Sequence, residues 1–234
     1  MKLKDILSPS FRDYRKPPKP MMVVATDSDF CRETVDSGIL TPQQMAHAAE
    51  RYLLGKSISG RCIFWMIDDC GIVRDGHVGD SWVSLLLKAR EPKFLSSWYA
   101  RHCLFGLHLI SDIIPRPSSI GIVESEKSAV ILSELYPDNI WLATMYPTNF
   151  TINLLKPLRG HQVMLYPHTD ETMSNYLCWL EIADMARRDM HLDITCSSIL
   201  EDHATPAQKH RQIDLVGFLY EEPHTDFYDE EKNN

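Results

Sequence analysis

The chain has 234 residues, a formal net charge of −8 and 44% hydrophobic residues. This length suits one domain, or a domain with a smaller module, and allows a sizeable core. An acidic chain does not attract polyanions, so contact with nucleic acid would require a local basic patch or a metal ion. No run approaches the ~20 apolar residues that a membrane helix needs, so no membrane contact is expected.

The cysteines and the first residues point to a cytoplasmic protein. The six cysteines are widely spaced and form no Cys-x-x-Cys pair, so no zinc is expected. Residues 1–20 are too polar and too rich in proline for a secretory signal. We therefore expect free thiols in a reducing compartment.

Residues 1–40 are predicted to be weakly ordered, because "RKPPKP" is basic and broken by prolines. Sharper signals begin at Thr41, which can cap a helix that starts at Pro42. The run "RCIFWMI" and the turn signals "DDCG" and "DGHVGD" then predict a β-meander. The next run, "SWVSLLLKA", fits a strand or a helix equally well. Residues 41–115 are thus expected to form a helix plus a β-meander module.

From residue 116 to 220 strands and helices alternate. The expected strands are 119–123, 139–144, 161–167 and 191–195. The expected helices are 125–136 with Ser125 as its cap, 171–189 and 205–220. The apolar stripe of the second of these helices is expected to be Met173, Tyr176, Leu177, Leu180 and Ala183. This alternation predicts an α/β fold with a parallel sheet flanked by helices, followed by an acidic tail at 221–234.

Polar residues follow two of these strands. Glu124 ends the first strand, and His168, Asp170 and Glu171 follow the third. Parallel sheets bind ligands outside the carboxyl ends of their strands. If the two strands are neighbours, Glu124 and Asp170 face each other and can form a hard oxygen site for Mg²⁺, which orients phosphates. Spacing alone leaves this metal site and ordinary turn chemistry both open.

The stretch "GIVESEKSAVILSELYPDNIWLAT", followed by "GHQVMLYPHTDET", resembles a Toprim domain. Toprim is the metal-binding nucleotidyl-transfer and cleavage module of bacterial primases, topoisomerases and related nucleases. The run from Ala46 to Leu219, about three quarters of the chain, is similar to uncharacterised Toprim-like proteins of bacterial mobile elements, often primase- or helicase-associated. The resemblance implies a Toprim-like parallel sheet preceded by a small strand-rich module. It also implies two kinds of partner, either or both of which can apply. One is nucleic acid, DNA in particular, and the other is a replication or mobile-element protein.

The resemblance also assigns residues. Glu124 matches the Toprim glutamate, which is implied to be the catalytic general acid/base or metal-linked acid. Asp170 matches the second aspartate of an Asp-x-Asp pair, but His168 stands where the first is expected, and Glu171 comes one residue late. Histidine binds Mn²⁺ or Zn²⁺ better than Mg²⁺. The implied metal is Mg or Mn, held by Glu124, Asp170, His168 and Glu171.

Three residues are candidates for contact with nucleic acid or phosphate. Lys127, near the start of a helix, can hold a phosphate there or be an ordinary exposed lysine. Trp98 beside Arg101 is the best base-stacking candidate, although tryptophans are more often core residues. Asp214 is a separate candidate. It can be a further acid of the crevice or a hydrogen-bonded aspartate with a structural role.

Two functions of different class follow. The preferred one is a nucleic-acid-associated protein of DNA replication or mobile-element type, with a degenerate metal site and little or no catalysis. The missing acid at His168 and the negative net charge favour it. The alternative is an active Mg- or Mn-dependent nucleotidyltransferase or nuclease, primase-like, that uses Glu124 and Asp170.

Overall fold

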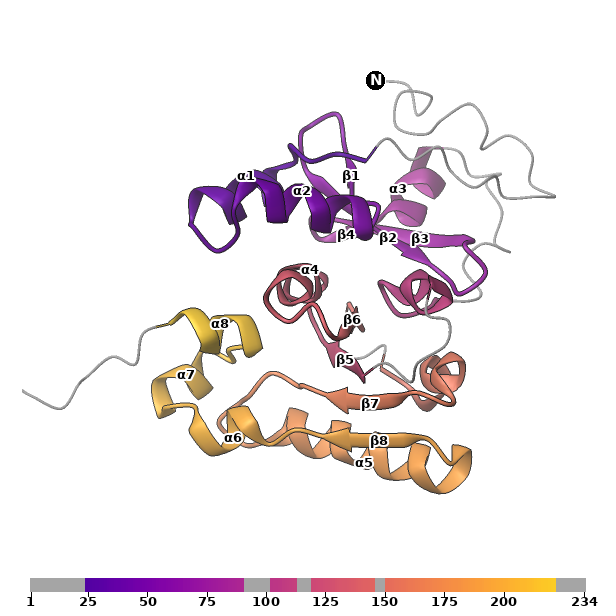
Figure 1. Ribbon diagram of the computed structural model, residues 1–234, viewed down its shortest axis with the longest axis vertical. Helices are drawn as coiled ribbons and strands as arrows, with labels where there is room; N and C mark the ends of the chain where they lie inside the picture. Colours follow the sequence, from indigo (N-terminus) through magenta and orange to yellow (C-terminus); the bar gives the residue numbers. More distant parts are fainter. Residues whose placement is uncertain (1–23, 91–101, 113–118, 146–149, 222–234) are drawn as a thin grey trace, which may run out of the picture.

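The computed structural model describes residues 24–90, 102–112, 119–145 and 150–221. At 87–90 and 111–112 it describes the backbone alone. Figure 1 shows an antiparallel four-stranded sheet above a parallel four-stranded one. This arrangement confirms the predicted fold class, an α/β protein whose parallel sheet follows a strand-rich module. The predicted acidic tail lies, but for Glu221, outside the described residues. No helix among these residues is long and apolar enough to cross a membrane.

The strand-rich module is an antiparallel meander with strand order β1-β2-β3-β4. Its elements are α1 (Asp29–Asp36), α2 (Pro42–Arg51), β1 (Gly55–Lys56), β2 (Cys62–Ile67), β3 (Val73–Val78), β4 (Ser81–Trp82) and α3 (Val83–Arg90). The ambiguous run "SWVSLLLKA" is therefore a two-residue strand followed by a helix. Thr41 caps α2 as predicted, and it forms a capping box with Gln44, since the side chain of each accepts from the backbone N–H of the other.

Helix α1 shows that the prediction of weak order for residues 1–40 was wrong over its last part. The Ser28 hydroxyl caps this helix by accepting a hydrogen bond from the N–H of Cys31 at 3.3 Å. Phe30, Cys31 and Leu40 are buried in the main core. The apolar contacts of these residues hold the segment in place, and the prediction, which rested on the proline-rich stretch alone, did not take them into account.

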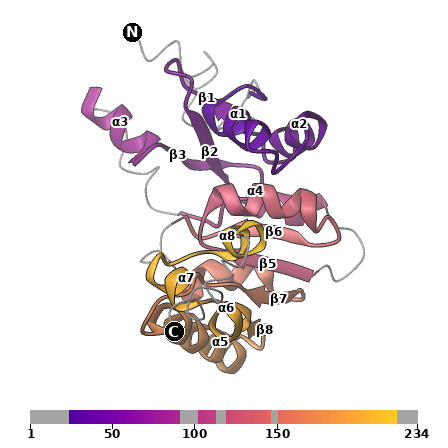
Figure 2. The same ribbon diagram turned by 90° about the vertical axis from the view of Figure 1, so that its left-hand side faces the viewer.

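The parallel sheet has the strand order β6-β5-β7-β8. Its elements are β5 (Ser119–Val123), α4 (Glu126–Leu135), β6 (Ile140–Ala143), the 3₁₀ helix η5 (Ile152–Leu158), β7 (Gln162–Leu165), α5 (Ser174–Met190) and β8 (Asp193–Cys196). Helix α4 packs on β6 and β5 and also meets α2, so it lies between the two sheets (Figure 2). Helix α5 packs on β8.

One short connection and one close contact inside the parallel sheet complete this part of the fold. The 3₁₀ helix η3 (Leu107–Asp112) joins the modules, and just before it Phe105 forms an antiparallel bridge with Ala143 of β6. Within the parallel sheet, the Trp141 ring lies across Gly121, where a Cβ would come within 2.5 Å of the Cε3 atom of the ring. Glycine is therefore required at residue 121 by the packing of the core.

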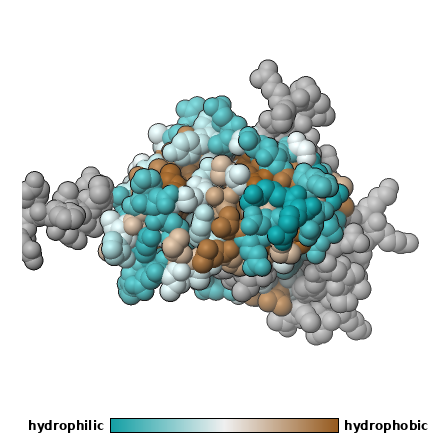
Figure 3. Space-filling model, turned by 90° about the horizontal axis from the view of Figure 1, so that it is seen from below, coloured by the Kyte–Doolittle hydropathy of each residue, from teal (hydrophilic) through white to brown (hydrophobic). Residues whose placement is uncertain are grey.

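The predicted apolar stripe of α5 was largely wrong. The buried residues of α5 are Trp179, Ala183, Ala186 and Met190, whereas Leu177 is 54% exposed. The helix buries the face that carries Trp179, which contacts the ring of Phe150 with 4.5 Å between centroids. In Figure 3, the side of the molecule where α5 and β8 lie shows a strip of hydrophobic residues between hydrophilic areas.

The closing segment forms α6 (Ile199–His203), α7 (Pro206–His210) and α8 (Leu215–Tyr220). The single helix predicted for 205–220 is thus broken in two. Gln212 adopts a left-handed conformation with φ of 54°, and Asp214 caps α8 by accepting from the N–H of Gly217. Figure 1 shows these three helices at the end toward which the arrows of β7 and β8 point.

Candidate functional site

The strand order reverses between β5 and β7. From β5 the chain passes through α4 to β6 on one side, and it then crosses to β7 on the other side of β5. Such a switch point leaves a crevice outside the carboxyl ends of the strands. Here a cleft of about 640 Å³ is lined by residues 124–126, by His168 and by several residues between 211 and 217, with His77 and Met145.

Glu124 and His168 meet in this cleft. Glu124 follows β5, and its carboxylate contacts Nδ1 of His168, which follows the neighbouring strand β7. The Glu124 carboxylate, as the acceptor for the Nδ1–H of His168, raises the pKa of His168 above its usual 6.5, although burial opposes this effect. The negative charges of Asp170 and Asp214 add to the increase in this pKa. The pair therefore stabilises a positive charge where the Toprim resemblance expects a carboxylate.

Asp170 uses its carboxylate to cap α5. Its Oδ1 accepts from the N–H and hydroxyl of Thr172 and from the N–H of Ser174, at 2.7, 2.5 and 3.2 Å. Its Oδ2 accepts from the Ser174 hydroxyl and the Asn175 N–H, at 3.1 and 2.8 Å. Burial alone would raise the pKa of Asp170, but these hydrogen bonds outweigh it and hold the pKa well below the usual aspartate range. Asp170 was predicted to face Glu124, but its carboxylate instead accepts hydrogen bonds from Thr172, Ser174 and Asn175.

Of the four predicted metal ligands, the structure brings Glu124 and His168 into contact, whereas Asp170 and Glu171 have other partners. Glu171 is exposed and pairs with His210, with 3.0 Å between Oε1 and Nδ1. In the described part of the chain, the group of three potential ligands whose atoms all lie within 4.8 Å of one another is Asp68, Asp69 and Cys70 instead.

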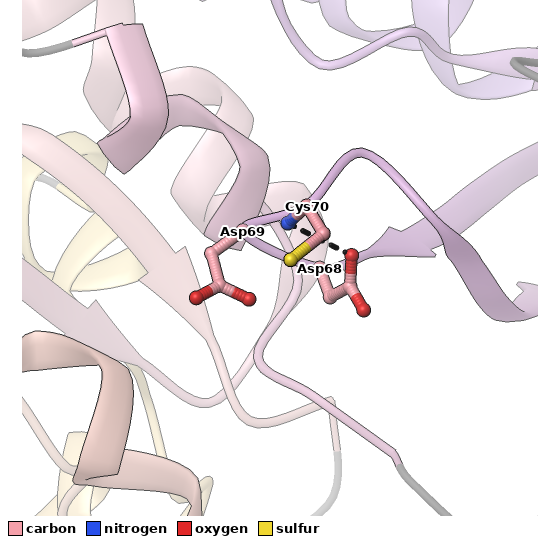
Figure 4. A group of neighbouring side chains, drawn as sticks. All are labelled: Asp68, Asp69 and Cys70. Atoms are coloured by element: carbon pink, nitrogen blue, oxygen red, sulfur yellow. Dashed lines mark hydrogen bonds between the residues drawn. The ribbon is translucent and has the colours of Figure 1, made fainter.

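That second group lies in the turn between β2 and β3, where "DDCG" predicted a turn. Asp68 accepts hydrogen bonds from the N–H groups of Cys70 and Ile72 and faces the Arg74 guanidinium, whose Nε is 2.7 Å away. Figure 4 shows the carboxylates of Asp68 and Asp69 on either side of Cys70. Asp68 thus closes the turn and is paired with Arg74, which accounts for its own place in this group.

A second carboxylate–imidazole pair lines the cleft. Glu126, in the first turn of α4, is buried, and its Oε1 lies 2.5 Å from Nδ1 of His77 on β3. The His77 ring lies 5.4 Å from the ring of Trp82. Nothing in the sequence indicates this pairing, because the two residues lie 49 positions apart.

The other candidates have different placements. The Nζ atom of Lys127 lies 5.9 Å from the centroid of the Phe30 ring, a cation–π contact with the strand-rich module. Trp98 and Arg101 lie outside the described residues. Asp214 combines both predicted roles, since it lines the cleft and accepts hydrogen bonds from the Ser128 hydroxyl and the Gly217 N–H.

Fold and site together define an α/β protein with a ligand-sized crevice at the switch point of a parallel sheet. The chain belongs to a protein family described as a domain of unknown function (DUF6371), whose model matches residues 35–169. The match includes Glu124 and His168 but not the wall of the cleft at 211–217. No curated protein matches the chain.

Proposed function

We propose that this protein is a Toprim-like, nucleic-acid-associated module of DNA replication or mobile-element type, acting in the cytoplasm, which binds its partner with little or no catalysis. The contact between Glu124 and His168 carries this proposal. An active centre of the Toprim type would require converging carboxylates for a hard cation. Here one carboxylate is matched by an imidazole, and Asp170 is committed to a helix cap.

The charges of the cleft support binding of a phosphate without a metal. Glu124 pairs with His168 and Glu126 with His77, while Asp214 accepts two hydrogen bonds, so each carboxylate already has a partner. The amino end of the ten-residue helix α4 opens at the same cleft, and its partial positive charge favours anions. The raised pKa of His168 favours its protonated form, whose charge offsets that of Glu124 beside this helix end.

Binding of a fluorescent single-stranded DNA in EDTA, followed by anisotropy at several KCl concentrations, tests the proposal. We expect affinity that falls as salt rises, with no cleavage or extension of the DNA when Mg²⁺ or Mn²⁺ is added. His168→Gln should weaken binding. The matched control is His47→Gln, because His47 is an exposed histidine on α2, paired with Glu134 away from the cleft. Absence of binding to both DNA and RNA would refute the proposal.

Calorimetry with Mn²⁺ separates the two functions. We expect no binding to the wild-type cleft and a gain of affinity in His168→Asp, which supplies the carboxylate that the Toprim pattern has at this position. The alternative, an Mg- or Mn-dependent enzyme, would be established by metal-dependent turnover that Glu124→Gln and Asp170→Ala both abolish.

A further inference from the structure

His168 stands in an extended stretch after β7 that belongs to no strand or helix. Its backbone is nevertheless held on both sides. The carbonyl oxygen of His168 accepts a hydrogen bond from the side-chain amide of Asn175 at 3.0 Å. The next residue, Thr169, donates its N–H to the carbonyl of Ile213 at 3.1 Å. A loop residue in contact with Glu124 is thus tied to α5 and to the closing segment.

The side chain of Thr169 makes a third tie, to α6. Thr169 is fully buried, and its hydroxyl donates to Oε1 of Glu201 at 2.9 Å. The Glu201 side chain is only 4% exposed. Its other oxygen lies 3.2 Å from Nζ of Lys209, which also donates to the Glu201 carbonyl at 2.8 Å. Burying a carboxylate is costly unless it is paired and hydrogen-bonded, and both oxygens of Glu201 meet that condition.

We propose that Glu201 is a positioning residue of the cleft: acting through Thr169, with Lys209 as its counter-charge, it holds His168 against Glu124. Glu201 lies in the closing segment, beyond the residues 35–169 that the family model matches. The closing segment therefore completes the site in two ways, by lining the cleft and by fixing the histidine. This inference concerns the Glu124–His168 contact alone and does not depend on binding of nucleic acid.

The geometry explains why one buried hydroxyl has this effect. Hydrogen bonds weaken steeply as their angle and length depart from the preferred values. Thr169 is the immediate neighbour of His168, so a backbone shift that follows loss of the Thr169–Glu201 hydrogen bond would displace the imidazole as well. The cap formed by Asp170 fixes the loop on the α5 side, and Glu201 fixes it on the α6 side.

NMR of protein labelled with ¹⁵N-histidine tests the proposal without any ligand. The Nδ1 proton of His168, bonded to a carboxylate, should give a far-downfield resonance, identified by its absence in His168→Gln. Thr169→Val keeps the side-chain shape but removes the donor to Glu201, so we expect this resonance to move upfield or disappear. Thr169→Ser retains a hydroxyl and should restore it.

Ser133→Ala is the matched control, because it also removes a buried hydroxyl, which donates to Val130 at 2.7 Å within α4. It should lower thermal stability and leave the His168 resonance in place. If Thr169→Val loses stability but keeps the wild-type resonance, Thr169 and Glu201 are merely structural and the proposal is overturned. Should Thr169→Val fail to fold, Lys209→Gln removes the counter-charge of Glu201, and an unchanged resonance in that variant overturns the proposal equally.

Discussion

Glu126 and His77 face each other across the boundary between the two sheets, with 2.5 Å between Oε1 and Nδ1. Their side chains are 9% and 13% exposed. The pair ties strand β3 to the first turn of α4, where the cleft opens. It therefore links the strand-rich module to the site through one polar contact.

Replacing His77 by Ala should destabilise the protein by about 1–3 kcal/mol, because Glu126 is left buried without this partner. Urea denaturation of His77→Ala, Glu126→Gln and the double variant forms a complete cycle. We expect a coupling energy of about 0.5–3 kcal/mol, as for residues in contact. If the single effects add to within about 0.5 kcal/mol, the contact contributes no stability.

Asp170→Ala should cost about 2 kcal/mol, at the upper end for the loss of a helix cap, because several donors lose their acceptor together. Asp193→Ala, at an exposed residue of β8, is the control and should have little effect. The pKa of Asp170 is lowered in the folded state, so its contribution is complete above the unfolded value near 3.8 and is lost as pH falls below it. Urea denaturation between pH 2.5 and 7 should therefore show that the free energy of unfolding falls more steeply with decreasing pH in the wild type than in Asp170→Asn.

Glu124→Gln should lower stability most at slightly acidic pH. The pKa of His168 is raised in the folded state, so the pair stabilises the fold fully below the unfolded value near 6.5. That contribution is lost as pH rises through the folded pKa. Urea denaturation from pH 5 to 9 should show the gap between wild type and variant closing toward high pH.

The control for this pH profile is Glu134→Gln, which removes the carboxylate partner of the exposed His47. The His47 side chain is 65% exposed but that of Glu134 only 9%, so a loss of about 1–3 kcal/mol is expected, and its pH profile is compared with that of Glu124→Gln. A gap for Glu124→Gln that widens above pH 7 would contradict a raised pKa of His168 in the folded state.

Gly121→Ala should destabilise the protein by about 1–3 kcal/mol, the usual cost of overpacking, since the new methyl group would meet the Trp141 ring. Gly217→Ala is the matched control, because its nearest contact, the Asp214 carboxylate, is 3.4 Å away and α8 continues through it. We expect this change to be neutral or stabilising by up to about 1 kcal/mol. Thermal denaturation compares the two, and equal melting temperatures would show that the ring moves aside freely.

Local signals in the sequence predicted a good part of the fold. The strand before Glu124, the cap at Ser125 and the capping box at Thr41 were all confirmed, because each depends on residues close together in the chain. The rule for parallel sheets correctly placed the residues that follow β5 and β7 at one crevice. The predicted partner of Glu124 was Asp170, however, and the structure has His168 there instead.

What the sequence did not reveal depends on distant contacts or on competing partners. The pairing of His77 with Glu126 joins two modules and leaves no local trace. The capping role of Asp170 had a signal, since Thr172, Ser174 and Asn175 follow it at the start of a helix, but the Asp-x-Asp resemblance favoured a metal ligand instead. The choice of the buried face of α5 is made by Trp179 against Phe150, not by the period of apolar residues alone.

The bridge between Phe105 and Ala143 bears on self-association. Phe105 donates its N–H to the Ala143 carbonyl at 2.9 Å and accepts the Ala143 N–H at 3.1 Å, so both backbone groups on the outer side of β6 are used there. The Phe105 ring is also stacked on Tyr52, which anchors the bridge in the core. Exposed strand edges are the places where β-proteins recruit further chains and form aggregates. The segment that joins the two modules thus also protects one margin of the parallel sheet against strand addition.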